Sequence, residues 1–281
     1  MNNLHPSFDV EIYRECNQDL RTKSDIELIS HYEKYGQFEN RMFAKAWETS
    51  DRISMRWLRG DGLEIGPGKS PCRLYGSLTN CKYSDVDYEK RFGSKNVDYY
   101  FSVDQDTPLI VDNTKFDFVI ARHVLEHANS FLKALENMID ITKENGMIYI
   151  VLPCIDFDFD KAWLPHHNFE HHIDEYHNKY IYSESHQNDF LRHFTRFTST
   201  SPNDTNAVLF NDPIIINCIK EKSPIPESKR FFYHKHNYDF EGWINIILSS
   251  IHYLENAVKL ADCSFGSERM DCHFVLQKRT P

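Results

Sequence analysis

Short apolar runs, separated by polar turns, occupy the middle of the chain. Their length and continuity are typical of strands in a parallel sheet that is buried on both faces. Between the last two runs, apolar residues recur at helical spacing from a cap at Ser130 to a left-handed end at Asn145–Gly146. Because strand, helix and strand alternate, the pattern predicts an α/β fold with a mostly parallel sheet and right-handed crossovers. The runs lie at residues 62–65, 81–87, 97–103, 115–121 and 147–152.

The two ends of the chain carry other patterns. Ser24 and Glu27 form a capping box before a helix that Gly36 ends, which predicts a helical unit at this end. Toward the other end, Asp239 can cap a further helix, and residues 270–278 alternate like a final antiparallel strand. The apolar residues at helical spacing are Ile26, Ile29, Tyr32 and Tyr35 in the first helix and Phe240, Trp243, Ile247 and Ile251 in the last.

These patterns divide the chain into four parts. Residues 1–46 are expected to form the helical unit, 47–155 the core, 156–232 an insertion that acts as a lid, and 233–281 the completion of the sheet. The insertion contains the apolar stretch 207–219 between proline-containing turns, which predicts a hairpin or an extra helix.

The first strand ends in a glycine turn. Gly66 and Gly68 let the main chain turn and approach a ligand without a Cβ, so the turn predicts the floor of a nucleotide-like cofactor site, with an ordinary strand-to-loop turn as the alternative. About 20 residues further on, Asp87 can accept both hydrogen bonds of a ribose diol at the end of the next strand, and Asp85 competes for this role.

Four segments then occur in a familiar order, at residues 63–68, 83–87, 116–127 and 145–150. Together they resemble the core of class I S-adenosylmethionine-dependent methyltransferases of the group called type 11, over roughly residues 58–153. The resemblance implies a Rossmann-like sheet of seven strands with helices on both faces, S-adenosylmethionine as cofactor and S-adenosylhomocysteine as product. The cofactor contacts it implies are Glu64, Gly66 and Gly68, with Pro67 between them, for the methionine part; Asp87 for the ribose; Asp104 or Gln105 for the adenine; and Arg122 and His123 after the fourth strand. The family more often has a third glycine where this chain has Ser70.

Two related enzyme classes fit less well. A dinucleotide-dependent dehydrogenase would carry three glycines in its fingerprint, and an acidic residue such as Glu64 has no role before the first of them. A nucleic-acid base methyltransferase would carry an Asn or Asp, two prolines and an aromatic residue where this chain has residues 121–124.

Composition limits the size of the core, the class of partner and the cellular location that we expect. The chain of 281 residues can bury one large core and an accessory unit, and 41% of its residues are hydrophobic. A formal net charge of −10 argues against a nucleic-acid partner. There is no apolar run of membrane-spanning length and no secretion signal, and the 7 scattered cysteines fit reduced thiols, so we expect a cytoplasmic enzyme without a membrane span.

The amino-terminal residues carry a second likeness. Residues 8–41 resemble a short helical module found beside bacterial glycosyltransferases. The likeness implies a place in surface-polysaccharide or glycan assembly, with other enzymes of that assembly as partners. The alternative is a helical cover for the cofactor pocket.

Histidines gather after the fifth strand, where five of the 15 fall within residues 166–177. Some methyltransferases of this group carry a similar acidic and aromatic segment there. In one interpretation His171, with His127 or His123 as second candidates, is the general base, and Glu170 or Asp174 orients it. In another, His167 and His171 hold a divalent metal with Asp174 or Glu175, which methyl transfer does not require. In a third, the histidines have no chemical role.

A hydroxyl-rich acceptor such as a sugar suits this composition, because carboxylates accept hydroxyl hydrogens and aromatic rings cover apolar faces. His234 and His236 precede the last predicted helix and join the candidates, with a strand edge whose alternate side chains face solvent as the alternative. The residues expected to contact the acceptor are Trp163, His167, Asp174, Tyr176, His234 and His236. Trp47, Trp57, Trp163 and Trp243 are candidates for stacking on a sugar or for the core.

The sequence therefore predicts an S-adenosylmethionine-dependent O-methyltransferase that acts on a sugar or glycan by in-line transfer with a histidine base. No residue is assigned to a metal, and a homo-oligomer is compatible with the sequence. The alternatives are an N- or carboxyl methyltransferase for small molecules and a catalytically silent cofactor-binding partner in glycan assembly.

Overall fold

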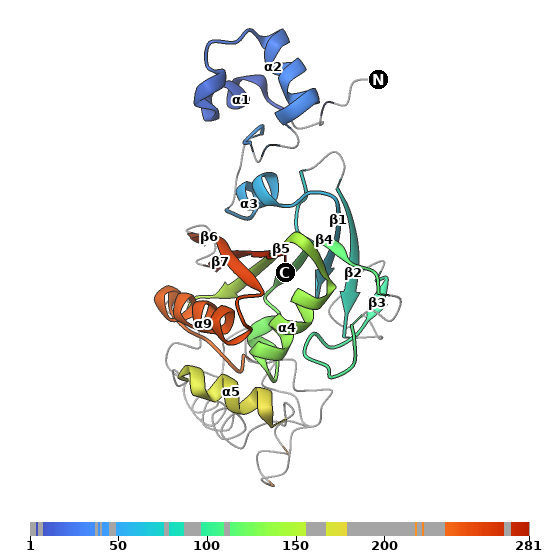
Figure 1. Cartoon of the computed structure of the whole chain (residues 1–281), viewed down its shortest axis with the longest axis vertical. Helices are drawn as coiled ribbons and strands as arrows, with labels where there is room; N and C mark the ends of the chain where they lie inside the picture. The colour runs from blue at the N-terminus through green and yellow to red at the C-terminus, as the bar shows by residue number, and fades with distance from the viewer. Residues whose placement is uncertain are drawn as a thin grey trace.

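The computed structural model contains one seven-stranded sheet in the order β3-β2-β1-β4-β5-β7-β6 (Figure 1). Strands β1 to β5 are parallel, and β7 is antiparallel to both β5 and β6. The predicted mostly parallel sheet of seven strands is therefore confirmed. The strands are β1 Asp61–Ile65, β2 Asn80–Asp85, β3 Tyr99–Tyr100, β4 Phe116–Arg122, β5 Thr142–Pro153, β6 Val258–Gly266 and β7 Asp271–Lys278. The structure describes residues 4, 8–36, 39, 41–44, 49–75, 79–86, 97–109, 113–155, 167–178, 217, 221, 234–266 and 271–280.

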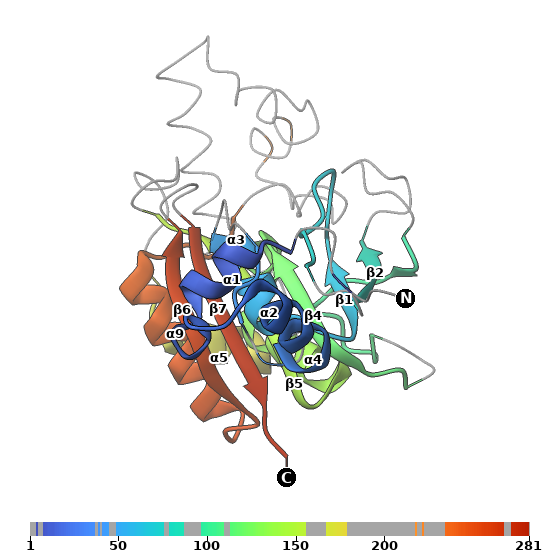
Figure 2. The ribbon, with the colours of Figure 1, turned by 90° about the horizontal axis from the view of Figure 1, so that it is seen from above.

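Alternate residues of the central strands pack on opposite faces of the sheet. On β4, Val119 and Ala121 join the larger apolar cluster, which includes side chains of α4 (Phe131–Ile141) and α9 (Phe240–Tyr253). Phe118 and Ile120 point to the other face, where they pack with Ile53 of α3 (Thr49–Trp57). This two-residue period in a fully buried strand is the reason for the continuous apolar run in the sequence. Figure 2 shows α9 beside β6.

Two element boundaries differ from the prediction. Helix α4 ends at Ile141, because the Thr142 hydroxyl donates to the carbonyl of Met138 and the backbone of Thr142 is extended. The left-handed residue is Asn145, with a φ of +62°, and it lies within β5 rather than at the helix end. The third strand has only two residues, since the chain turns after it and the Ser102 amide donates to the side chain of Gln105.

The amino-terminal helices are α1 (Val10–Cys16) and α2 (Asp25–His31), followed by a π-helical turn (Tyr32–Gly36). The predicted capping box is present: the Ser24 hydroxyl accepts from the Glu27 amide, and the Glu27 carboxylate accepts from the Ser24 amide. Ile26 is 81% exposed, so the predicted apolar spacing did not identify the buried face. The cluster inside this unit consists of Tyr13, Leu20, Leu28, Tyr32, Phe43 and Ala44, and it continues into the core through Met55 and Tyr75.

The last predicted helix is α9, and the Asp239 carboxylate caps it by accepting from the Gly242 amide, as expected. Helix α5 (Phe169–His177) carries three of the clustered histidines, His171, His172 and His177, and Asn168 caps it. None of the helices in the described part of the chain has the length and apolar character needed to cross a membrane. Several predictions fall outside the described residues: Asp87, Trp47, Trp163, His166 and the stretch 207–219 apart from residue 217.

Candidate functional site

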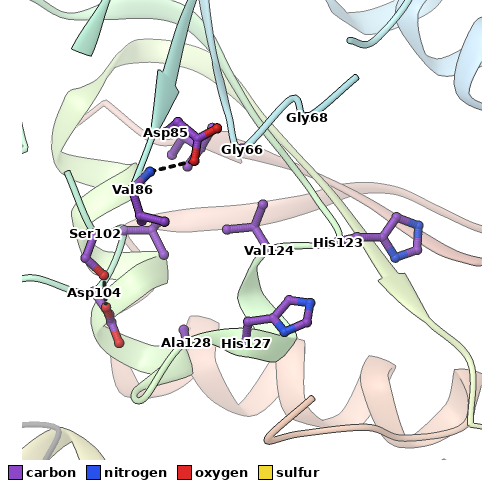
Figure 3. A pocket seen from close by; sticks show the side chains of 12 residues that line it. Gly66, Gly68, Asp85, Val86, Ser102, Asp104, His123, Val124, His127 and Ala128 are labelled. Carbon is purple, nitrogen blue, oxygen red and sulfur yellow. Dashed lines mark hydrogen bonds between the residues drawn. The ribbon is translucent and has the colours of Figure 1, made fainter. Parts of the chain in front are cut away.

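A cavity of about 290 Å³ opens at the carboxyl ends of β1, β2 and β4. This is the point where the strand order reverses direction between β1 and β4, which is the usual binding position of open parallel sheets. Figure 3 shows Asp85 and the Ser102–Asp104 turn on one side of the cavity, with the loop after β4 opposite. The cavity is lined by Ile65, Gly66, Gly68, Asp85, Val86, Ser102, Val103, Asp104, His123, Val124, His127 and Ala128.

The glycine turn forms one wall of this cavity, as predicted. Gly66 has a φ of +62° and Gly68 a φ of +54°, conformations that L-residues with a side chain rarely adopt. The Gly66 amide donates to the Ser84 carbonyl at 2.8 Å, which ties the turn to β2. A Cβ at position 66 would stand 2.8 Å from Cγ2 of Val124, so the turn fits closely against the loop after β4.

Two carboxylates lie in the wall that faces the loop after β4 (Figure 3). Asp85 is buried at the end of β2, where its Oδ1 accepts from the Val86 amide at 2.8 Å. The structure thus places Asp85, the competing candidate, at the cavity. Asp104 also lines it, and its Oδ1 accepts from the Ser102 hydroxyl at 2.6 Å. The Gln105 side chain instead donates to Thr107 at 2.9 Å, outside the cavity wall.

Glu64 lies beneath the glycine turn rather than in the cavity wall. Its two carboxylate oxygens accept from the Cys72 amide at 3.0 and 2.9 Å, and Arg122 Nη1 is 3.8 Å from Oε1. Burial raises the pKa of Glu64 to about 7, although the Cys72 amide and Arg122 lower it in part. Arg122 also donates to the Ser70 carbonyl at 3.4 Å. Glu64 and Arg122 therefore hold the segment from Gly66 to Cys72 in place. Pro67, in this segment, is buried between the two glycines.

The loop after β4 places ionisable groups at the cavity. His123, with a φ of +54°, lies with Nδ1 3.4 Å from Glu126 Oε1 and Nε2 3.4 Å from Asp271 Oδ2. Burial opposes charge on this ring, but the hydrogen bonds to Asp271 and Glu126 prevail and raise the pKa of His123 to about 10. Burial likewise opposes charge on Glu126, yet His123 and His127 lower its pKa. At neutral pH His123 is thus a cation and Glu126 an anion.

His127 occupies the same loop one helical turn later, in the 3₁₀ turn Leu125–His127. Its Nε2 is 3.9 Å from Glu126 Oε1, and its ring meets that of His234 edge-on with a centroid distance of 4.8 Å. Sequence reasoning named His127 and His234 but missed Glu126 and Asp271. Glu126 could have been found from its place between the two histidines. Asp271 has no local signal, because β7 brings it from the other end of the chain.

Comparison with known proteins decides the family. A family model described as "Methyltransferase domain" matches residues 32–200, more than half of the chain. The chain belongs to this methyltransferase family. No curated protein matches the sequence.

Several solved structures are similar to the chain at low sequence identity. The CurJ carbon methyltransferase is 11% identical, with 82% of this chain and 53% of that chain covered and a TM-score of 0.39. The N-methyltransferase NodS from Bradyrhizobium japonicum WM9 is 10% identical, with 83% and 93% covered and a TM-score of 0.38. A putative S-adenosylmethionine-dependent methyltransferase from Listeria monocytogenes is 10% identical, with 79% and 92% covered and a TM-score of 0.40. The chain spans about half the length of CurJ.

The protein is thus a methyltransferase with S-adenosylmethionine as cofactor. The residues of the cavity fit this group: the turn at Gly66 leaves a space that a Cβ would fill, and the buried carboxylates of Asp85 and Asp104 line the same cavity. Among the described residues, neither Trp57 nor Trp243 lines the cavity. Trp57 donates to Asp262 at 2.9 Å, and Trp243 is fully buried and donates to the Pro153 carbonyl at 2.8 Å.

A second group of ionisable side chains joins α5 to the segment before α9. His171 Nε2 lies 3.2 Å from Glu175 Oε1, and His236 Nε2 lies 3.0 Å from Glu175 Oε2. The ring of His167 stacks on that of His171 with a centroid distance of 3.9 Å. The carboxylate next to His171 is therefore Glu175. The predicted orienting residues, Glu170 and Asp174, are exposed on the same helix.

A short segment of main chain, residues 234–236, connects the ionisable group at the cavity of this methyltransferase with the second group at His171 and Glu175. The Lys235 amide donates to the Glu126 carbonyl at 2.8 Å, and its buried ammonium donates to the His127 carbonyl at 2.7 Å. His234 therefore lies against His127, whereas His236 is fully buried beside Glu175. The alternative of a strand edge with one face in solvent is wrong. Tyr176, another predicted acceptor contact, donates to Glu136 at 2.8 Å on α4.

Proposed function

We propose that this methyltransferase transfers the methyl group to a hydroxyl oxygen of a sugar or glycan, with His127 as the general base. The observation that carries the proposal is the contrast between the two imidazoles that line the cavity. His123 is held between Asp271 and Glu126 and is protonated at neutral pH. His127 lines the cavity with its Nε2 3.9 Å from Oε1 of the buried Glu126.

The chemistry assigned to each residue follows from charge. S-adenosylmethionine supplies a methyl group that its sulfonium already activates. The glycine turn at Gly66 and Gly68 and the carboxylates of Asp85 and Asp104 bind and orient the cofactor. His127 removes the proton of the acceptor hydroxyl at Nδ1 or Nε2, and the buried Glu126 anion stabilises the imidazolium that results.

His123 has a different task in this scheme. As a cation whose two N–H groups face Glu126 and Asp271 it cannot accept a proton, and its charge keeps Glu126 ionised. His171, the first candidate from the sequence, does not line the cavity among the described residues, and its Nε2 contacts Glu175. The geometry thus favours His127, the second candidate.

Support for a sugar acceptor comes from the polar character of the groups around the opening. His127, His234, Asp271 and Ser102 can each bond a hydroxyl group. The likeness of residues 8–41 to a module beside bacterial glycosyltransferases supports glycan assembly as the setting, with the amino-terminal helices as the contact to other enzymes of that assembly. The rival acceptors are small-molecule amines and carboxylates.

The first test measures release of S-adenosylhomocysteine with nucleotide sugars, short glycans, amines and carboxylic acids as acceptors. We expect turnover with a sugar, and His127→Asn should lower kcat by about 10²- to 10⁴-fold while cofactor affinity stays within a few-fold. His252→Asn, an exposed histidine on α9, is the matched control and should keep full activity.

Three outcomes would contradict the proposal. Turnover with an amine or a carboxylic acid alone would assign a different acceptor. Unchanged kcat in His127→Asn would remove the base from this position. Tight cofactor binding with no turnover on any acceptor would favour a silent partner of a glycan-assembly complex.

A further inference from the structure

The group at His171, Glu175 and His236 has the composition of a metal centre. The ligand-type atoms are two imidazole nitrogens and a carboxylate, and they all lie within 4.8 Å of one another. His236 is fully buried, and the Glu175 side chain is 3% exposed. We propose that these three residues bind one zinc-class divalent cation.

The two imidazoles lie against different oxygens of the Glu175 carboxylate, close to the spacing of ligands around one ion. With zinc–nitrogen and zinc–oxygen bonds of about 2.0–2.2 Å, neighbouring ligand atoms of a tetrahedron are about 3.3–3.5 Å apart. The separations are 3.2 Å from His171 Nε2 to Glu175 Oε1 and 3.0 Å from His236 Nε2 to Glu175 Oε2. A small outward shift of the two rings would admit the ion, with a fourth position left for water or a further ligand.

The chain positions the ligands from two separate segments. His171 and Glu175 are four residues apart on α5, so they project from the same face of the helix. His236 comes from the segment before α9, which the Tyr238 bridge to Cys154 fixes beside the end of β5. Two imidazoles with one carboxylate are a ligand set used by zinc, whereas magnesium and calcium take oxygen ligands.

Groups around the ligands hold them in place. His172 Nε2 and the Tyr238 hydroxyl are 2.8 Å apart, and His172 Nδ1 is 3.7 Å from Glu175 Oε2. The parallel stacking of His167 on His171 fixes the plane of that ligand ring. Such contacts behind the ligands orient them and tune affinity in known metal sites.

The proposed ion would act on the catalytic loop by positioning. The His236 amide donates to the Glu126 carbonyl at 3.3 Å, and Lys235 bonds the Glu126 and His127 carbonyls. A metal that fastens α5 to His236 therefore also fixes the turn that carries His127. The inference does not depend on which acceptor the enzyme uses.

The test uses the full-length protein and needs no substrate. Metal content after loading with zinc and dialysis should be one zinc per chain, and a chelator should remove it reversibly with a lower Tm. His171→Asn and Glu175→Gln should each weaken zinc binding at least about 10-fold, measured by competition with a chromophoric chelator. Cobalt substitution should give visible absorption bands that both variants lose. His177→Asn, an exposed histidine on the same helix, is the matched control and should bind zinc like the unaltered protein.

Circular dichroism and the cofactor affinity of each variant show whether a variant has lost metal binding alone or has lost its fold. The chelator experiment uses the unaltered protein and so does not depend on the variants. The proposal is overturned if the loaded protein holds no stoichiometric zinc, if His177→Asn loses the metal to the same extent, or if zinc remains bound in both ligand variants. In the first case the three residues form an ion-paired cluster only.

Discussion

At the scale of single residues, the position of His123 decides which imidazole can accept a proton. Its ring bridges Glu126, three residues further along the same loop, and Asp271, which is remote in sequence at the start of β7, and its backbone adopts the left-handed conformation. The two carboxylates stabilise the imidazolium more than burial destabilises it. A histidine held between two carboxylates is thus poorly suited to act as a base.

This charge state predicts a distinctive pH dependence. Because the pKa of His123 is raised to about 10 in the folded protein, its contribution to stability is fully present below the unfolded value near 6.5 and is lost as the pH rises through about 10. An NMR titration should show the ring protonated at pH 8. His123→Asn, which suits the left-handed backbone, should reduce the fall in Tm between pH 7 and pH 10. An ordinary midpoint near 6.5 for His123 would contradict the assignment.

At the scale of elements, the cavity depends on the close approach of the turn after β1 and the loop after β4. Mutation can separate the backbone strain at position 66 from the contact between that position and Val124. Gly66→Ala should lower the free energy of unfolding by about 1–2 kcal/mol, because its φ of +62° disfavours a Cβ, and should weaken cofactor binding. The new Cβ would also stand 2.8 Å from Val124 Cγ2.

Val124→Ala removes that methyl group. The double variant should therefore recover part of the affinity that Gly66→Ala loses, but none of the backbone cost. Calorimetry with S-adenosylmethionine and chemical denaturation measure the two effects, with Val124→Ala alone as the control. If the changes in binding free energy of the two single variants add up to the change in the double variant, the turn and the loop are independent.

The same comparison of elements shows what a sequence can predict. The runs that became β1, β4 and β5, the glycine turn, and the caps at Ser24, Ser130 and Asp239 depend on neighbours within a few residues. The end of α4 and the short β3 depend on a hydroxyl and an amide bond that spacing does not reveal. Asp271 was missed because β7 brings it to His123 from a distant part of the chain, whereas Glu126 and Glu175 lie only three and four residues from the histidines that they contact.

At the scale of the whole molecule, the amino-terminal helices and the sheet share one apolar cluster. Phe43 lies between Tyr32 of the helical unit and Tyr75 of the core, with ring centroids 5.1 and 6.4 Å away. All described residues that line the cofactor cavity lie at position 65 or later, so none of the described residues of the helical unit is in its wall.

Removing the Phe43 ring should therefore destabilise the amino-terminal helices before the sheet. Phe43→Ala deletes a fully buried side chain, for which about 3–5 kcal/mol is typical. Amide hydrogen exchange should accelerate in residues 10–36, while cofactor affinity stays within about twofold of the unaltered protein. Ile26→Ala, on an 81% exposed side chain, is the control and should change neither measurement. A large loss of cofactor affinity in Phe43→Ala would instead show that the helices cover the pocket.

The location of Asp271 has a consequence for synthesis. Strand β7 is the last strand of the chain, yet it lies inside the sheet between β5 and β6. While the ribosome is still adding these residues, the nascent chain exposes an open edge on β5, and His123 lacks one of its two counter-charges. The loop after β4 can thus acquire its final protonation pattern only after β7 has been translated and has paired with β5.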